Sequence, residues 1–220
     1  MYRRARSLPE RCGCTPNGTT CADKTLAVCN SDGKSETTTA GASGGLAQVA
    51  TFEPLGGGCD GGPSDSTGGG GGGAIQWVSL SSFVVTRSGA VNVGGGGGAD
   101  HGGGGAGGTV LAEAPLVSLL GKVTANGAAG GACGKSGPHA TPDGIAAPGV
   151  GGCSGTMTLS GAGGTGSSAP TDGFASPADP GAGSGGAAGR LGIHSRDGTY
   201  EHDAQSVLSA KITTDPLRLR

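Results

Sequence analysis

Residues 72–79 read GGAIQWVS and residues 107–114 read GGTVLAEA, so the same short pattern returns 35 residues later. After the two glycines, apolar residues stand at every second position, which is the period of a β-strand with one buried face. A second match joins GAVNV at 89–93 to GKVTANG at 121–127, and a third copy of the first pattern, GRLGIHS, begins at residue 189. No copy has enough apolar surface for a core of its own, so we expect the copies to stack.

This pattern predicts a mainly β fold of short stacked strands, similar to a β-helix or solenoid, joined by long glycine-rich loops. Helix should be nearly absent. A small β-sandwich with long glycine loops is the alternative. We expect one core to contain Ile75, Val91, Val110, Val123 and Ile193. The expected strands are residues 74–80, 83–86, 90–93, 109–120, 122–126 and 190–195.

Composition separates the chain from ordinary enzymes. Glycine supplies 52 of the 220 residues, in runs such as 68–73, 94–98 and 102–105, whereas Leu, Ile, Val and Phe together supply only 33. Glycine loses more backbone entropy on ordering than any other residue, so a glycine run folds only where a neighbour holds it or where two backbones approach closely. A structural or surface protein is therefore expected, and a conventional globular core is not.

Charge and hydropathy exclude further classes. The formal net charge is −2, without the basic surplus that nucleic-acid binding requires. No apolar run is long enough to span a bilayer, and the basic start of the chain lacks the apolar stretch of an export signal. We divide the chain into a cysteine module with a Ser/Thr/Gly linker at 1–45 and a glycine-rich β region at 46–220. The β region contains a low-complexity Pro/Gly/Ala/Ser insert at about 136–188.

Seven cysteines favour an oxidising compartment. Four lie within eighteen residues, beside the turn sequences PNG and SDG, as in a small disulfide-linked module. Zinc is the alternative, although structural zinc ligands usually come as C-x2-4-C pairs, which are absent here. Because seven is odd, at least one thiol is free or paired between chains. The disulfide candidates are Cys12, Cys14, Cys21, Cys29, Cys59, Cys133 and Cys153.

Several catalytic or binding motifs match the sequence but lack the flanking residues that their chemistry requires. AGGACGKS at 129–136 fits a loose phosphate-loop pattern, but GPHATP follows and cannot form the helix whose amides hold phosphate. GGGGAD at 95–100 resembles the start of a calcium nonapeptide without its apolar strand position or a second copy. His194 and His202 lie among Asp197, Glu201 and Asp203, which could bind a metal, but we interpret this stretch as a solvated loop.

Side chains for polysaccharide chemistry are equally sparse. The repeat strands offer only Arg87, Glu113, Lys122 and Arg190. Trp77 could serve as a sugar platform, but beside Ile75 and Phe83 a core position is the better interpretation. We therefore assign no catalytic, cofactor-binding or metal-binding residues and no cofactor.

The cysteine pattern carries a resemblance. Residues 14–33 (CTPNGTTCADKTLAVCNSDG) and the element GGCDGG at 57–62 resemble exported or cell-surface proteins of gliding Gram-negative soil bacteria, as do GGAIQWVS, ANG at 125–127 and GRLGI at 189–193. Relatives usually carry further cysteines after the Thr run, an export signal and a longer apolar region. The resemblance implies a surface location and no particular activity.

We expect a non-enzymatic, extracellular or cell-surface structural or adhesive protein of the envelope or matrix. Its candidate partners are extracellular polysaccharide or other envelope proteins, with no nucleic acid and no membrane span, and its oligomeric state is left open. A carbohydrate-binding or carbohydrate-active β-helix is the competing class, and a truncated remnant without function is a third.

Overall fold

A computed structural model describes residues 44–45, 52, 55–63, 66–151, 159–173 and 181–217. These residues contain nine β-strands and no helix, so the mainly β class is confirmed. Nearly all of the expected cysteine module lies outside the described residues. No described segment forms a helix with the length and apolarity that a bilayer crossing needs.

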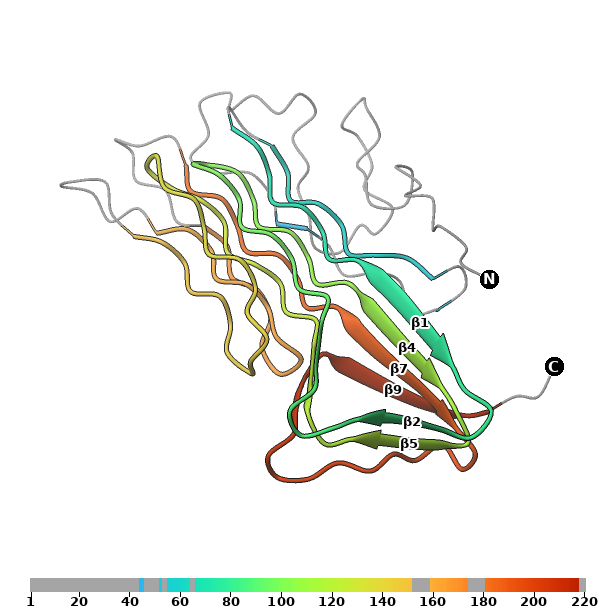
Figure 1. Ribbon diagram of the computed structural model, residues 1–220. Coiled ribbons are helices and arrows are strands. Elements are labelled where there is room, and N and C mark those ends of the chain that lie inside the picture. Colours follow the sequence, from blue (N-terminus) through green and yellow to red (C-terminus); the bar gives the residue numbers. More distant parts are fainter. Residues whose placement is uncertain are drawn as a thin grey trace.

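The strands form three parallel sheets through which the chain passes repeatedly (Figure 1). The first sheet has the order β1 (Ala74–Val78), β4 (Thr109–Glu113), β7 (Arg190–Ser195) and β9 (Lys211–Pro216). The second pairs β2 (Ser82–Val85) with β5 (Leu116–Leu119). The third has the order β3 (Ala90–Asn92), β6 (Lys122–Thr124) and β8 (Val207–Ser209).

Strand pairing follows the sequence repeat. Ala74 of β1 pairs with Thr109 of β4, which is the offset of the GGAIQWVS and GGTVLAEA copies. Val91 pairs with Val123, as the shorter repeat predicts. β7, in the copy that begins at residue 189, pairs next to β4. Equivalent positions of the repeat therefore lie directly above one another in each sheet.

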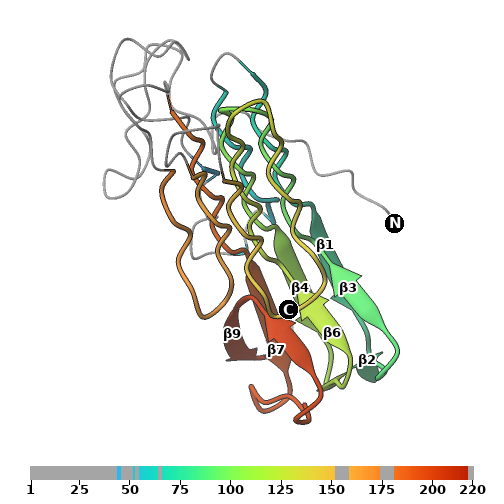
Figure 2. The ribbon, with the colours of Figure 1, turned by 90° about the vertical axis from the view of Figure 1, so that its left-hand side faces the viewer.

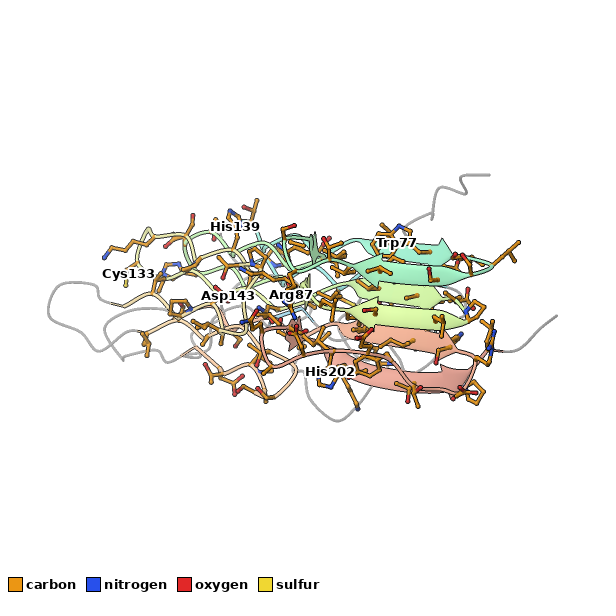
Figure 3. The ribbon with its side chains drawn as sticks, turned by 60° about the horizontal axis from the view of Figure 1, so that its bottom comes forward. Trp77, Arg87, Cys133, His139, Asp143 and His202 are labelled. Carbon is orange, nitrogen blue, oxygen red and sulfur yellow. The ribbon has the colours of Figure 1, made fainter. Side chains whose placement is uncertain are left out.

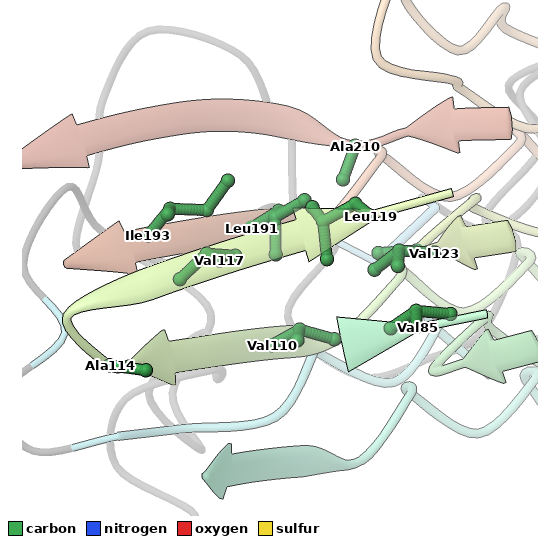
Figure 4. Packing of buried hydrophobic residues seen from close by; sticks show 10 residues of the cluster. Val85, Val110, Ala114, Val117, Leu119, Val123, Leu191, Ile193 and Ala210 are labelled. Carbon is green, nitrogen blue, oxygen red and sulfur yellow. The ribbon is translucent and has the colours of Figure 1, made fainter. Parts of the chain in front are cut away.

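The inward side chains form one core between the sheets (Figure 4). Val110, Val123 and Ile193 are buried in it, and Ile75 and Val91 pack against it while partly exposed. The prediction that these five residues share a core is confirmed. Alternation explains the result, because every second side chain of each strand points to the same face.

Two strand predictions need correction. The expected strand at 109–120 is divided into β4 and β5, because the chain turns at Ala114 and Pro115. Proline has no amide hydrogen for a ladder bond, so it marks a strand boundary. The strands β8 and β9 were not among the predicted ranges, although the residues near 191–212 have a strand-like composition.

The glycine runs are more regular than the expected loops. In the segment 102–108, successive amides donate to three different neighbouring segments and return to the same one every third residue. The bonds run from Gly103 and Ala106 to Gly62 and Cys59, from Gly104 and Gly107 to Ser184 and Ala187, and from Gly105 and Gly108 to Gly96 and Val93. A period of three without internal bonds is that of a polyproline-II-type helix, here formed by glycine.

The segment 102–108 lies at the centre of a bundle of such segments (Figure 2). Its carbonyls accept hydrogen bonds from three further segments, through the amides of Gly45, Gly69, Gly72, Ala128 and Gly131. The stretch at 136–188 contributes as well, since its Gly137, Gly161 and Gly164 amides donate to Gly98, Gly183 and Gly186. The bundle continues directly into the sheets, because residues 73, 108 and 189 immediately precede β1, β4 and β7.

Close backbone approach explains why the bundle uses glycine. Among the described glycines, only Gly134, Gly181 and Gly198 have positive φ, so backbone conformation does not demand glycine along most of the runs. A Cβ on Gly104 would instead overlap the Ala128 carbonyl oxygen. The same collision with a neighbouring backbone recurs throughout the interior of the bundle. At these positions only a residue without a side chain allows the helices to pack.

Candidate functional site

A row of polar side chains crosses the first sheet, with one residue from each strand. Gln76 of β1 donates to Glu113 of β4 at 2.5 Å, and the other Glu113 oxygen lies 3.1 Å from His194 Nδ1 of β7. His194 Nε2 lies 3.9 Å from Asp215 Oδ2 of β9. We call these four residues the polar row. Its imidazole lies between two carboxylates, an arrangement that orients the histidine ring.

Strand register positions the polar row. Glu113 pairs with His194 and His194 with Asp215, so the three side chains point to the same side of the sheet. The repeat places Glu113 and His194 at equivalent positions, although 81 residues separate them. From the sequence, His194 was considered together with Asp197, Glu201 and Asp203. Glu113 was identified on a repeat strand but not as its partner, and Asp215 was not identified. Aligning the copy that begins at residue 189 with the copy that begins at residue 107 would have placed Glu113 beside His194.

An aromatic ring covers part of the same sheet face. Phe52 and His194 meet edge to face, with ring centroids 6.3 Å apart. A Cβ on Gly192 would come within 2.6 Å of Phe52 Cζ, so glycine at this strand position leaves space for the ring. His194 is therefore only 24% exposed. The ring and the two carboxylates hold the imidazole in one place.

Residues 194–203 were interpreted from the sequence as a solvated loop, and the structure gives His202 and Asp203 partners other than His194. His202 packs on Tyr200, with ring centroids 5.3 Å apart. Asp203 binds Arg87 of the first repeat at 3.0 Å. The Gln205 backbone amide, aided by Ser206 and Arg87 against a weaker effect of desolvation, lowers the pKa of Asp203. Figure 3 shows Arg87 and His202 on the side-chain view.

Residues of the two other sequence motifs have local structural partners. Cys133 and Gly134 have φ of 57° and 71°, and Ala132 pairs with Lys135 across them, so the GKS motif lies in a tight turn. No helix follows this turn in the described part of the chain. Asp100, from the calcium-like motif, accepts a hydrogen bond from the Gly134 amide.

The aromatic candidate lies at the start of the core. Trp77 stacks on Phe83 with ring centroids 5.1 Å apart, and both pack against the buried cluster while partly exposed. Trp77 is therefore part of the apolar packing of the first three strands. Lys122 begins β6, and Arg190 begins β7.

A shallow cavity of about 470 Å³ lies between residues 165–167 and 206–210. Small polar side chains line much of it, including Thr165, Ser167 and Ser206. The Ser206 hydroxyl already donates to Asp203 at 3.1 Å. Such a surface offers hydroxyl groups to a neutral polar ligand but no acid or base.

Cysteine contributes covalent bonds to the described region. Cys59 and Cys133 are each disulfide-bonded, and Cys59 is buried. The other candidates, Cys12, Cys14, Cys21, Cys29 and Cys153, lie outside the described residues. Within the described residues, no three His, Cys, Asp or Glu side chains are placed to hold a metal ion.

Comparison with known proteins gives no relative: no protein-family model, curated protein or solved structure matches this chain.

Proposed function

We propose that this chain is a non-enzymatic, exported structural or adhesive element of the cell envelope or matrix. The observation that supports this most directly is the glycine bundle, in which the segment 102–108 shares backbone hydrogen bonds with six other segments. Such packing places main-chain groups where most proteins place side chains. It favours a stiff, protease-resistant body over a site that must change shape.

We also infer that the three sheets are the faces of a short β-solenoid. The parallel pairing supports this, because residues of successive repeats occupy equivalent positions in the first and third sheets. In this interpretation the polar row is a stabilising ladder on one solenoid face. Its members already satisfy one another at 2.5 and 3.1 Å.

The export assignment rests on cysteine chemistry and on the resemblance of residues 14–33 and 57–62 to surface proteins of gliding bacteria. Disulfide bonds at Cys59 and Cys133 fit an oxidising compartment. The test is protease treatment of intact native cells, followed by immunoblotting of cell and matrix fractions. We expect the chain in the surface or matrix fraction with its disulfides formed. Recovery only in the cytoplasm with reduced thiols would contradict the proposal.

A carbohydrate-binding role is the second candidate, favoured by the hydroxyl-lined cavity near Thr165 and Ser206. Co-sedimentation with insoluble polysaccharides separates the two roles. A purely structural element should not pellet with them, whereas saturable binding reduced by Ser167→Trp would favour the second candidate. Release of soluble sugar by the purified chain would contradict the non-enzymatic assignment.

A further inference from the structure

The two ends of the stacked sheets differ in their protection against association. Natural sheets protect free edges with charged residues, proline or bulges. The last strand, β9, has Lys211, Asp215 and Pro216, and its edge is protected in this way. The first three strands, β1, β2 and β3, each lie at an edge of their sheet as well. Between residues 74 and 93, however, the only charged residue is Arg87.

That single charge already forms an ion pair within the chain. The Arg87 guanidinium lies 3.0 Å from Asp203. The end formed by β1, β2 and β3, which we call the first-coil end, is therefore uncharged where the chain would need repulsion to remain alone. It is also apolar: Leu80 is 98% exposed and Val78 69%, while Trp77 and Phe83 are only partly buried.

Among the described strands, none pairs with the side of the β1 backbone away from β4. The Thr109 amide donates to the Gly73 carbonyl, and the Ser79 amide donates to the Glu113 carbonyl. Odd-numbered residues of β1 therefore direct their backbone groups toward β4. Because these groups alternate along a strand, Ala74 and Gln76 direct theirs toward the open edge.

From these observations we propose that the first-coil end is a homodimer interface, in which β1 pairs antiparallel with β1 of a second copy about a two-fold axis at Gln76. An uncharged surface meets its own copy without repulsion, which an end with unpaired charges would not do. In this register Gln76 lies opposite Gln76, Ala74 opposite Val78, and Ile75 opposite Trp77 of the other copy. Apolar side chains therefore face apolar side chains. The outward backbone groups of Ala74, Gln76 and Val78 form hydrogen bonds with those of the second copy.

The geometry has a consequence for shape. A two-fold axis across β1 reverses the strand direction of the second copy. The glycine bundles, which precede β1 along the strand axis (Figure 1), would then point in opposite directions. The dimer would be elongated, with the sheets at its centre.

The test uses the full oxidised chain in analytical ultracentrifugation over a range of micromolar concentrations. We expect a reversible dimer for the unaltered chain. Gln76→Lys places two like charges opposite each other and should weaken dimerisation about tenfold or more. Thr213→Lys is the matched control, because Thr213 occupies the same register row on the protected edge of β9. It should leave the dimer unchanged.

Two further measurements keep the proposal testable if Gln76→Lys misfolds. Ala74→Pro removes only an outward amide, which an edge strand tolerates, and it should also favour the monomer. Trp77 is the only tryptophan of the chain, so its emission should shift to the red as the unaltered chain is diluted. A monomer at every concentration would overturn the proposal. Equal dimerisation of Gln76→Lys and Thr213→Lys would overturn it too.

Discussion

Single glycines of the bundle differ in what they have to accommodate. A Cβ on Gly107 would overlap the Ala125 carbonyl oxygen, whereas a Cβ on Gly70 would meet nothing within 4 Å. Both residues lack positive φ, so alanine is compatible with the backbone at either position. The neighbouring backbone, and not the conformation of the residue, decides the outcome.

Gly107→Ala and Gly70→Ala therefore form a matched pair. We expect Gly107→Ala to lower the free energy of unfolding by about 3 kcal/mol or more, because rigid backbone must move away. Gly70→Ala should raise it by about 0.4–1 kcal/mol through reduced unfolded-state entropy. Denaturant titration of both variants measures the difference. Equal effects would show that the bundle is not packed as described.

Asp203 provides a titration that can be followed at one residue. Its pKa lies below the ordinary value of 3.8, with the Gln205 amide as the main cause. A carboxyl whose folded pKa is lowered stabilises the fold above its unfolded pKa, and this contribution disappears as pH falls through the folded pKa. We expect Asp203→Asn to be less stable than the unaltered chain near neutral pH. The difference should begin to shrink as the pH falls below 3.8 and disappear once the pH is below the folded pKa, and a difference that grows on acidification would contradict the assignment.

Among the elements, the strands could be predicted from the sequence because apolar residues alternate along them. The glycine helices could not, because they have no such alternation. Ile75, Val110 and Ile193 could be assigned to one core because strand period and repeat offset agree. The glycine helices left no such pattern, since most interior positions hold glycine and the others, such as Ala106 and Ala128, hold alanine. On the outer helix, exposure returns at every third residue, at Thr67, Gly70 and Gly73.

The polar row was missed for a related reason. Neither Glu113 nor Asp215 lies near His194 in the sequence, and only strand register brings the three side chains together. Register depends on the pairing of several copies at once. Local motifs such as the histidines and acids of residues 194–203 therefore indicated the wrong neighbours.

Amide hydrogen exchange tests the glycine helices as elements. Gly104, Gly105 and Gly107 donate to neighbouring carbonyls at 2.8–2.9 Å, so their amides should exchange slowly. The amides of Gly70 and Gly73 make no hydrogen bond to a described residue and should exchange at nearly unprotected rates. Resonance-resolved exchange measures both groups in one sample. Uniformly fast exchange across the runs would indicate loops in place of a bundle.

At the scale of the whole molecule, the bundle and the sheets depend on each other. Each glycine helix that leads into β1, β4 or β7 fixes the position at which that strand begins, and the sheet in turn fixes the distance between the helices. Ordering backbone costs about 1–2 kcal/mol per residue, while a hydrogen bond contributes about 0.5–1.5 kcal/mol net. A bundle held mainly by backbone hydrogen bonds is therefore close to balance by itself, and needs the apolar core and covalent links.

Disulfide reduction tests that dependence. Cys59 belongs to a bundle helix and accepts a hydrogen bond from Ala106, and Cys133 lies at the end of the bundle away from the strands (Figure 3). Both are disulfide-bonded.

Reduction removes a constraint on the unfolded chain, so each broken bond should lower the free energy of unfolding by about 2–4 kcal/mol. Denaturant unfolding followed by circular dichroism, with and without a phosphine reductant, measures the loss, and hydrogen exchange locates it. Because the core of Val110, Leu191 and Ile193 contains no cysteine, glycine amides should lose protection at lower denaturant than strand amides. Unchanged stability after complete reduction would mean that the backbone hydrogen bonds and the apolar core hold the bundle without covalent help.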